Sequence, residues 1–142
     1  MSIEEKQNFP TFLDSDFTEY PQNEKEVSGF IKKYYKSNIP VELVGSGTKR
    51  KIGRALQCGK ILSLSKLSGI IEYLPEELYI TVKACTPIKE IEEELKKKNQ
   101  QLAFEPIDFG YFLNGKSDFG TAAGEVACNI SGPRRFKVGS VR

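Results

Sequence analysis

The chain has 142 residues, of which 39% are hydrophobic, and its 21 Lys and Arg against 19 Asp and Glu leave a net charge of +2. This predicts one globular domain with a modest core and no general attraction for nucleic acid or an anionic membrane, so any anion site must be local. The chain has no histidine, which excludes Ser-His-Asp and Cys-His nucleophile systems and histidine-bound metals.

The first 20 residues are polar and acidic and lack the basic and apolar regions of a signal peptide. No apolar stretch approaches the roughly 20 residues that span a bilayer. The cysteines Cys58, Cys85 and Cys128 are odd in number and far apart, which is typical of free, buried thiols in a reducing cytosol. We therefore expect a soluble, cytoplasmic protein without disulfides.

An amphipathic helix is predicted over residues 23–38, ahead of Pro40. Its apolar positions recur with helical spacing, at Val27, Phe30, Ile31, Tyr34 and Tyr35. Short segments rich in β-branched and aromatic residues then predict strands at 41–44, 60–64, 70–74 and 78–83.

A second helix is predicted after Thr86-Pro87, which supplies an N-cap and a proline at the first helical position. Ile88, Ile91 and Leu95 share its buried face. Its solvated face pairs each acid with a lysine four residues later: Glu92 with Lys96, Glu93 with Lys97 and Glu94 with Lys98. A strand at 102–104 and a loop over 105–119 follow. Interleaved helices and strands indicate an α+β or α/β layer structure, and we predict α+β, a small mixed sheet with flanking helices.

A candidate anion site follows the strand 41–44 and consists of Gly45, Ser46, Gly47, Thr48 and Lys49. The glycines free the backbone to turn its N–H groups toward one point, and the Thr48 hydroxyl and Lys49 suit a pyrophosphate. The alternative is a tight strand-ending turn with solvated lysines, which the spacing alone favours. The spacing matches neither the P-loop nor the G-x-G-x-x-G fingerprint.

A second candidate segment, residues 120–135, is dominated by small side chains. Small residues let the backbone approach a flat cofactor and its diphosphate, with Thr121, Asn129 and Ser131 as hydrogen-bonding groups and Arg134 or Arg135 as a charge. Close helix-to-sheet packing is the alternative explanation. Two anion-competent segments in one small domain favour a diphosphate ligand over either segment considered alone.

Taken together, these motifs resemble a known family over about residues 39–142, in unbroken order. The matching stretches are the glycine loop 45–49, 62–74, Pro75-Glu76-Glu77-Leu78, Thr81-Val82-Lys83-Ala84, Thr86-Pro87, Leu102-Ala103-Phe104-Glu105-Pro106 and 120–135. They are similar to the FAD-binding subunits of bacterial glycolate oxidases, which have the vanillyl-alcohol-oxidase (PCMH) type of FAD-binding domain. The resemblance implies a PCMH-type domain over residues 23–142, preceded by an N-terminal extension over 1–22 and stopping before the second lobe and the cap domain.

The resemblance implies FAD as the cofactor and assigns its contacts, but no catalytic residue and no metal. It puts the pyrophosphate on the loop 45–49 and on the segment that contains Gly120, Thr121, Ala122, Ala123 and Gly124. Asn129, Ser131 and Gly132 would lie along the ADP-ribityl part, and Arg134 would supply charge.

Three departures from the family pattern bear on FAD affinity. Ala123 stands at a usual glycine, where its methyl group could crowd a phosphate oxygen. Cys85 also stands at a usual glycine. Glu125 replaces a usually apolar residue and should weaken FAD binding by like charge, unless a basic residue from Arg134, Arg135 or Lys137 offsets it.

In such a family the flavin accepts a hydride from a 2-hydroxy acid such as glycolate or lactate and passes electrons to partner subunits. We expect this chain to be incomplete and inactive alone. A cysteinyl flavin link through Cys85 or Cys128 is a remote option. The alternative is a non-catalytic remnant or interaction module that needs a partner chain, such as a separately encoded C-terminal half. Nucleic-acid binding through 49–54 and 134–142 is disfavoured by the near-neutral charge.

Overall fold

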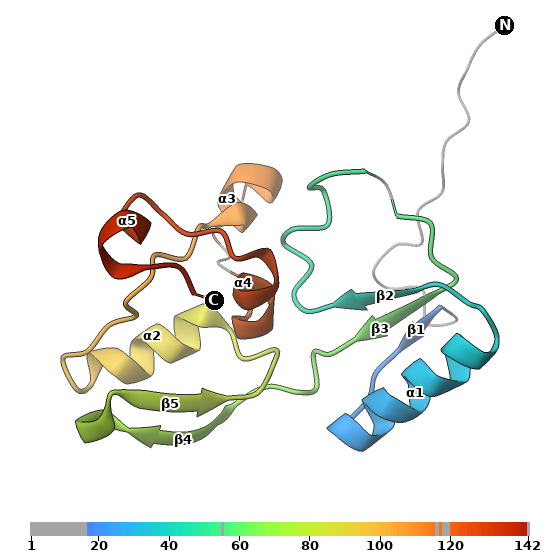
Figure 1. Ribbon diagram of the computed structural model, residues 1–142, viewed down its shortest axis with the longest axis horizontal. Helices are drawn as coiled ribbons and strands as arrows, with labels where there is room; N and C mark the ends of the chain where they lie inside the picture. The colour runs from blue at the N-terminus through green and yellow to red at the C-terminus, as the bar shows by residue number, and fades with distance from the viewer. Residues whose placement is uncertain (1–16, 55, 116, 118–119, 142) are drawn as a thin grey trace, which may run out of the picture.

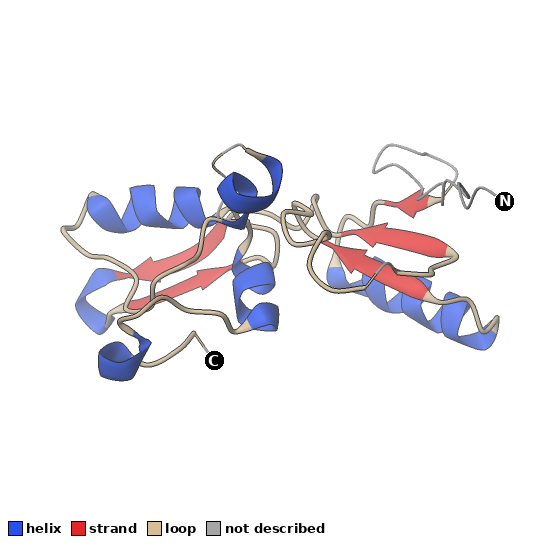
Figure 2. Ribbon diagram, turned by 90° about the horizontal axis from the view of Figure 1, so that it is seen from above, coloured by secondary structure: helices blue, strands red, loops and turns tan. Residues whose placement is uncertain are grey.

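The structure is a computed structural model that describes residues 17–54, 56–115, 117 and 120–141. Most of the predicted N-terminal extension, residues 1–16, lies outside the described residues. Figures 1 and 2 show two halves side by side, a small sheet with helix α1 (Glu24–Lys36) beside it and a second small sheet with the other helices around it. The first half contains β1 (Thr18–Glu19), α1, β2 (Val41–Val44) and β3 (Lys60–Ser63). The second half contains β4 (Ile70–Leu74), the 3-10 helix η1 (Pro75–Glu77), β5 (Tyr79–Val82), α2 (Ile88–Lys96), α3 (Phe109–Asn114), α4 (Ala122–Cys128) and α5 (Arg135–Val138).

Helix α1 begins where the sequence predicts it, because Asn23 caps its first turn. The Asn23 side chain accepts a hydrogen bond from the backbone N–H of Glu26 at 3.0 Å. The predicted apolar stripe is only partly buried, since Tyr34 is 3% exposed and Tyr35 is 83% exposed. The Tyr34 hydroxyl donates a hydrogen bond to Glu19 Oε1 in β1 at 2.5 Å, which fastens the helix to the sheet.

The first sheet is parallel, with strand order β1-β3-β2. Because β3 has a neighbour on both sides, its residues Ile61 and Leu62 are fully buried. In β2 the side chains alternate, with Val44 buried and Leu43 exposed. The sequence pattern does not indicate β1, which is two residues long and forms by pairing with β3.

The second sheet is the antiparallel hairpin of β4 and β5, close to the predicted ranges. Helix α2 packs against this hairpin through Ile88, Ile91 and Leu95, which confirms the predicted helix and its buried face. The hairpin contributes Tyr73 and Ile80 to this cluster. The core of the second half is therefore α2 packed on the hairpin, with Leu102 and Ala122 added from later segments.

The start of α2 is capped differently from the prediction. Pro87 occupies the N-cap position and Ile88 is the first helical residue. The Thr86 hydroxyl is buried and lies 3.0 Å from the Gly69 carbonyl oxygen and 2.8 Å from that of Lys83. Thr86 therefore ties the start of α2 to the residue that precedes β4, instead of capping the helix.

The exposed face of α2 carries the predicted acids and lysines but pairs them differently. Lys97 binds Glu94, and Lys89 lies 3.9 Å from Glu93. Long exposed side chains can reach several neighbours within one turn, so spacing alone does not select the partner.

Residues 102–104 do not form the predicted strand, and the predicted loop 105–119 contains α3. Leu102 packs against the α2 cluster from an irregular segment, so its apolar character reflects packing and not strand pairing. Helix α3 is capped by the Asp108 side chain and followed by Gly115 with a φ of 70°. These two residues are a helix start and stop signal that the sequence analysis missed.

The predicted α+β class is confirmed. Parallel pairing occurs in the first sheet and antiparallel pairing in the second, so the predicted mixed sheet is divided between two small sheets. In the described ranges, no helix is both long and apolar enough to cross a membrane.

Candidate functional site

The glycine loop 45–49 leaves β2 as a tight turn. Gly47 has a φ of 76°, a conformation that favours glycine, and its carbonyl oxygen accepts a hydrogen bond from the Arg50 backbone N–H at 3.2 Å. Within the described part of the chain, the backbone N–H groups of residues 46–49 donate no hydrogen bond to the protein. The described protein therefore leaves these N–H groups unoccupied, and an anion bound at this loop stays a prediction.

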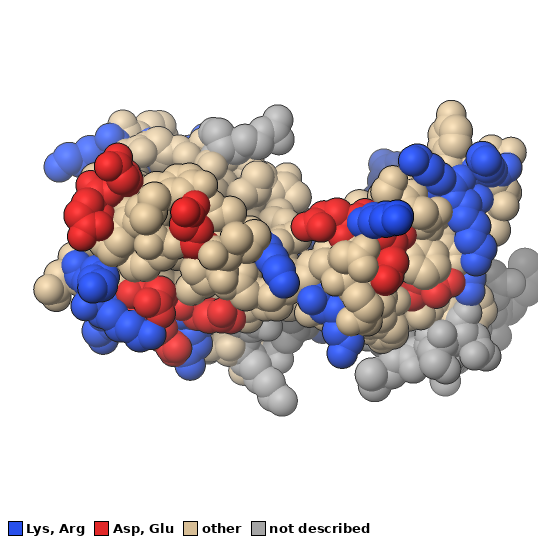
Figure 3. Space-filling model, turned by 90° about the horizontal axis from the view of Figure 1, so that it is seen from below, with Lys and Arg blue, Asp and Glu red and all other residues tan. Residues whose placement is uncertain are grey.

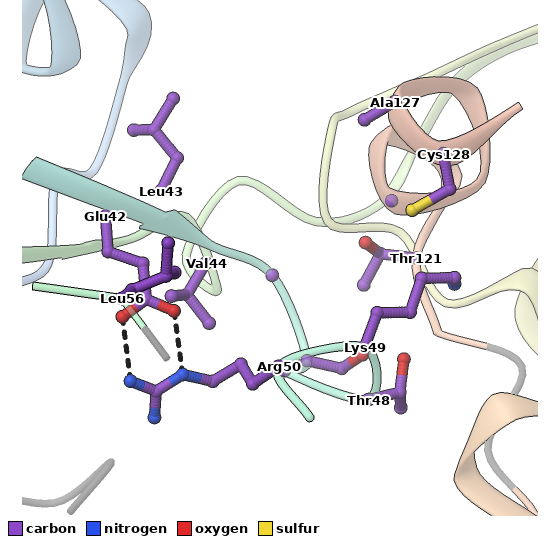
Figure 4. A pocket seen from close by; sticks show the side chains of 14 residues that line it. Glu42, Leu43, Val44, Thr48, Lys49, Arg50, Leu56, Thr121, Ala127 and Cys128 are labelled. Atoms are coloured by element: carbon purple, nitrogen blue, oxygen red, sulfur yellow. Dashed lines mark hydrogen bonds and ion pairs between the residues drawn. The ribbon is translucent and has the colours of Figure 1, made fainter. Parts of the chain in front are cut away.

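Arg50 anchors the far end of the loop to β2. Its Nε and Nη2 atoms donate to the two carboxylate oxygens of Glu42, each at 2.7 Å, as Figure 4 shows. Glu42 is buried and the Arg50 side chain is 27% exposed, so the bidentate pair is partly shielded from water. The Cys58 thiol lies 3.8 Å from the same carboxylate, and burial, followed by the Glu42 charge, raises the pKa of Cys58.

The second segment enters α4 through Gly120, with a φ of 85°, and Thr121. The N–H groups of Ala122 and Ala123 donate to the carbonyl oxygens of Thr86 and Ala84, at 3.0 and 2.9 Å. The protein itself therefore uses these two N–H groups, and they are not free for a phosphate. The small residues Ala122 and Ala123 pack closely on residues 84–86, the connection between β5 and α2, and not on a sheet.

The two segments meet at the junction of the halves. A β-carbon on Gly120 would lie 3.0 Å from Thr48 Oγ1 and 3.2 Å from Lys49 Nζ. Gly45 in turn lies against the Thr121 side chain. Glycine at both positions lets segments far apart in the sequence come into direct contact.

A buried ion pair crosses this junction. Lys49 Nζ lies 2.5 Å from Glu125 Oε1, and the side chains of Lys49 and Glu125 are 12% and 1% exposed. Glu125 Oε2 is buried without a hydrogen-bond partner among the described residues. The predicted offset by Arg134, Arg135 or Lys137 is replaced by Lys49, because α4 turns Glu125 toward the glycine loop.

A pocket of about 260 Å³ lies between the loop and α4 (Figure 4). Of the predicted site residues it gathers Gly45, Ser46, Gly47, Thr48, Lys49, Thr121 and Gly124. Its other lining residues are Glu42, Leu43, Val44, Arg50, Leu56, Ala127 and Cys128. The sequence predicts none of them as a phosphate contact, although it offers Cys128 as a remote option for a flavin link and Arg50 as part of a basic run. Gly124, Ala127 and Cys128 have i, i+3, i+4 spacing, so a predicted helix over this segment would have indicated the last two.

The remaining predicted residues lie outside this pocket. Asn129 Oδ1 and Ser131 Oγ are buried without a hydrogen-bond partner in the described chain. Gly132 lies against Glu105, which also accepts a hydrogen bond from the Arg134 backbone N–H at 2.9 Å. Arg134 and Glu105 line a separate cavity of about 450 Å³.

The cysteines are free but not uniformly buried. Cys85 is buried, Cys58 is half-buried and Cys128 is exposed, so the expected burial holds for one thiol. Burial raises the pKa of Cys85, which disfavours its reactive thiolate form. No three His, Cys, Asp or Glu side chains gather as metal ligands within the described residues.

The site fits a diphosphate through its backbone more than through its charge. Free N–H groups, the Thr48 and Thr121 hydroxyls and the glycines can cradle phosphate oxygens, whereas Lys49 and Arg50 are already paired with carboxylates. On the face shown in Figure 3, basic and acidic side chains lie side by side over most of the surface, and the one run of basic side chains on this face lies at the outer end of the first half, away from the junction of the halves. A glycine-lined pocket of this kind on an α+β fold suits a nucleotide cofactor.

The sequence matches the FAD binding domain family over residues 16–142, and the chain belongs to this family. It is 38% identical over 112 residues to the glycolate oxidase subunit GlcE of Escherichia coli (strain K12). That alignment covers 79% of the chain and 30% of the relative, so the chain spans less than a third of this relative's length. The predicted family and its cofactor, FAD, are thereby confirmed.

The fold is similar to that of two solved structures of alkyldihydroxyacetonephosphate synthase. Their TM-scores are 0.64 and 0.61 at 17% and 18% sequence identity. Each comparison covers 87% of this chain, but 22% and 24% of the respective synthase chains. This similarity supports the fold of the PCMH-type domain.

Proposed function

We propose that the pocket binds the adenosine diphosphate part of FAD, and that the chain is the FAD-binding part of a glycolate-oxidase-like flavoprotein. The observation that carries this proposal is the meeting of the loop 45–49 with Thr121 and Gly124 at one pocket. Membership of the FAD binding domain family favours FAD over other diphosphates.

In this proposal the N–H groups of residues 46–49 and the hydroxyls of Thr48 and Thr121 donate to phosphate oxygens. Gly120, Ala122, Ala123 and Gly124 keep the second segment close to the loop. Asn129 and Ser131 each have a buried polar atom without a protein partner, which suits the hydroxyl groups of a ribityl chain or ribose. Gly132 and Arg134 belong to the proposed cofactor surface through the family resemblance.

The proposed reaction is the oxidation of a 2-hydroxy acid such as glycolate or lactate. Bound flavin supplies the hydride acceptor. We propose that the chain does not turn over substrate alone and that it acts in the cytoplasm with other glycolate oxidase subunits or a separately encoded C-terminal half. Its similarity to a part of GlcE supports this, since the alignment covers 30% of that subunit.

The test is a titration of the purified chain with FAD, ADP and FMN, read by flavin fluorescence and by thermal unfolding. FAD and ADP should bind saturably and raise the unfolding temperature, whereas FMN, which lacks the adenosine diphosphate part, should not. Thr121→Val should weaken ADP binding because it removes a hydroxyl from the pocket. Thr18→Val, which removes a buried hydroxyl from β1, is the matched control and should bind ADP as the unmodified chain does.

Equal ADP affinity of the two threonine variants would contradict the proposed role of Thr121. Failure of FAD and ADP to bind or stabilise the chain would contradict the proposed site as a whole. Reduction of bound flavin by glycolate or lactate would contradict the proposed inactivity of the isolated chain.

A second candidate function is an interaction module that needs a partner chain. Large apolar side chains on the second half favour it, since Leu78, Phe112 and Phe136 are 81%, 72% and 95% exposed. The partner in this proposal is the C-terminal half of the same flavin domain. The test is light scattering during size-exclusion chromatography of the chain mixed with that C-terminal half. Co-elution as a complex supports the proposal, and elution of the chain as a separate monomer contradicts it.

A further inference from the structure

We propose that Glu125 sets the affinity of the pocket for phosphates by holding Lys49. This inference rests on the proposed binding of an adenosine diphosphate group at the same pocket. In it, the Glu125 carboxylate and the phosphate groups of the ligand compete for one ammonium group.

The Lys49 ammonium group lies among the Phe109 ring, Gly120 and Gly124. It lies 5.2 Å from the centre of the Phe109 ring, and a β-carbon on Gly120 would lie 3.2 Å from it. A β-carbon on Gly124 would lie 4.0 Å from it. The ammonium group therefore fills the space that the small residues of the second segment leave open, and it binds Glu125 from a side chain that lines the pocket.

The ion pair of Lys49 and Glu125 is largely buried. Two opposite charges in contact, with side chains 12% and 1% exposed, present little net charge to a third group. Of the two Glu125 carboxylate oxygens, Oε1 binds Lys49, whereas Oε2 has no hydrogen-bond partner in the described chain. A phosphate that approaches Lys49 therefore meets a carboxylate directly behind the ammonium group.

The neighbouring cation does not compensate. Arg50 also lines the pocket, but both carboxylate oxygens of Glu42 hold its guanidinium group at 2.7 Å. Both basic side chains of the loop that face the pocket are thus paired within the chain. The pocket attracts a diphosphate mainly through backbone N–H groups and hydroxyls.

Removing the Glu125 charge should have two effects of opposite sign. The ligand-free chain should become less stable, because a mostly buried lysine loses its counter-charge. Binding of ADP should become tighter, because Lys49 is released and the repulsion of phosphate by the carboxylate disappears. A residue with a purely structural role would lower both properties.

The experiment compares Glu125→Gln with Glu93→Gln, an exposed residue of α2 whose replacement changes the net charge equally. ADP affinity is measured by calorimetry at low and high salt, and stability by thermal unfolding without ligand. Glu125→Gln should bind ADP about tenfold more tightly than the unmodified chain, with a steeper salt dependence, and unfold at a lower temperature. Glu93→Gln should match the unmodified chain in all three.

Two further measurements apply if Glu125→Gln does not fold. Glu125→Met, with an apolar side chain of similar volume, should show the same gain in affinity. The unmodified chain should bind ADP with a shallow salt dependence, because the cations of its loop are already paired. A steep salt dependence of the unmodified chain would overturn the inference without any variant.

The outcomes separate this inference from the proposed function. If the unmodified chain binds ADP and Glu125→Gln binds no more tightly, the inference fails and the proposed site stands. If ADP binds only after Glu125 is replaced, the proposed function of the unmodified chain fails, whereas the inferred competition between Glu125 and phosphate for Lys49 is supported. If neither folded protein binds ADP, both the proposed site and the inference are overturned.

Discussion

Gly45 in the loop after β2 and Thr121 at the start of α4 touch so closely that a β-carbon on Gly45 would lie 2.7 Å from Thr121 Oγ1. The same β-carbon would lie 3.5 Å from Cys85 Sγ. This contact joins the two halves at the candidate FAD site. It also explains why a residue without a side chain stands at this point of the chain.

Gly45→Ala should destabilise the chain by about 1–3 kcal/mol, because its methyl group forces the two segments apart. Urea unfolding measures this, and ADP binding should weaken in parallel. Gly29→Ala is the matched control: it lies inside α1 with open space around its β-carbon and should stabilise the chain by roughly 0.5–1 kcal/mol. Similar losses at both positions would contradict a specific contact at Gly45.

Thr86→Val should lower the free energy of unfolding by about 1–3 kcal/mol, because it leaves buried backbone groups unpaired. The Thr86 hydroxyl accepts a hydrogen bond from the Gly69 N–H at 3.0 Å and lies within donating distance of two carbonyl oxygens. Thr86→Ser retains the hydroxyl and should recover most of the stability in urea unfolding. If serine and valine are equally destabilising, packing and not hydrogen bonding accounts for the role of Thr86.

Arg50→Lys should destabilise the chain by roughly 1.5–3 kcal/mol, because an ammonium group cannot make the bidentate pair with buried Glu42. The loop 45–49 should loosen, and ADP affinity should fall. Lys89→Gln breaks an exposed pair with Glu93 on α2 and should leave the unfolding midpoint unchanged. A midpoint for Arg50→Lys equal to that of the unmodified chain would show that charge alone is sufficient at this position.

Tyr34 should make stability depend on pH at high pH. Burial, then the hydrogen bond and charge of Glu19, raise the pKa of Tyr34 from 10.0 to about 12. The folded chain thus holds the phenol proton more tightly than the unfolded chain, so this stabilisation is complete below pH 10 and is lost as the pH rises through about 12. Urea midpoints across this range should fall in the unmodified chain and fall less in Tyr34→Phe. Tyr35→Phe, which removes an exposed phenol from the same helix, should retain the unmodified profile.

Helices α1 and α2 were predictable because their signals are local. Asn23 lies within three residues of the N–H that it caps, and Ile88, Ile91 and Leu95 form one stripe whatever the helix packs against. The segment 102–104 was wrongly predicted as a strand because a short apolar run is compatible with either pairing or irregular packing. In the structure Leu102 packs against the buried face of α2, a contact that the apolar run 102–104 does not itself indicate.

The candidate site also combines features with a local sequence signal and features that depend on tertiary contacts. The loop 45–49 could be identified from residue type, since glycines and a hydroxyl beside a strand suit an anion. The partner of Glu125 could not, because Lys49 lies 76 residues away and reaches it only after the two halves meet. Likewise, nothing local shows that Thr86 and Ala84 occupy the N–H groups of Ala122 and Ala123.

The order of residues alone therefore determined the elements whose hydrogen bonds and apolar contacts close within one or two turns, together with the glycine segments typical of a flavin domain. Tertiary structure decided that the strands form two sheets, that the glycine loop faces α4, and that its lysine is neutralised by a buried carboxylate. The physical reason is the separation along the chain of the groups that interact. A cap or an apolar stripe depends on neighbours in the chain, whereas the charge and shape of a pocket depend on which distant groups folding brings into contact.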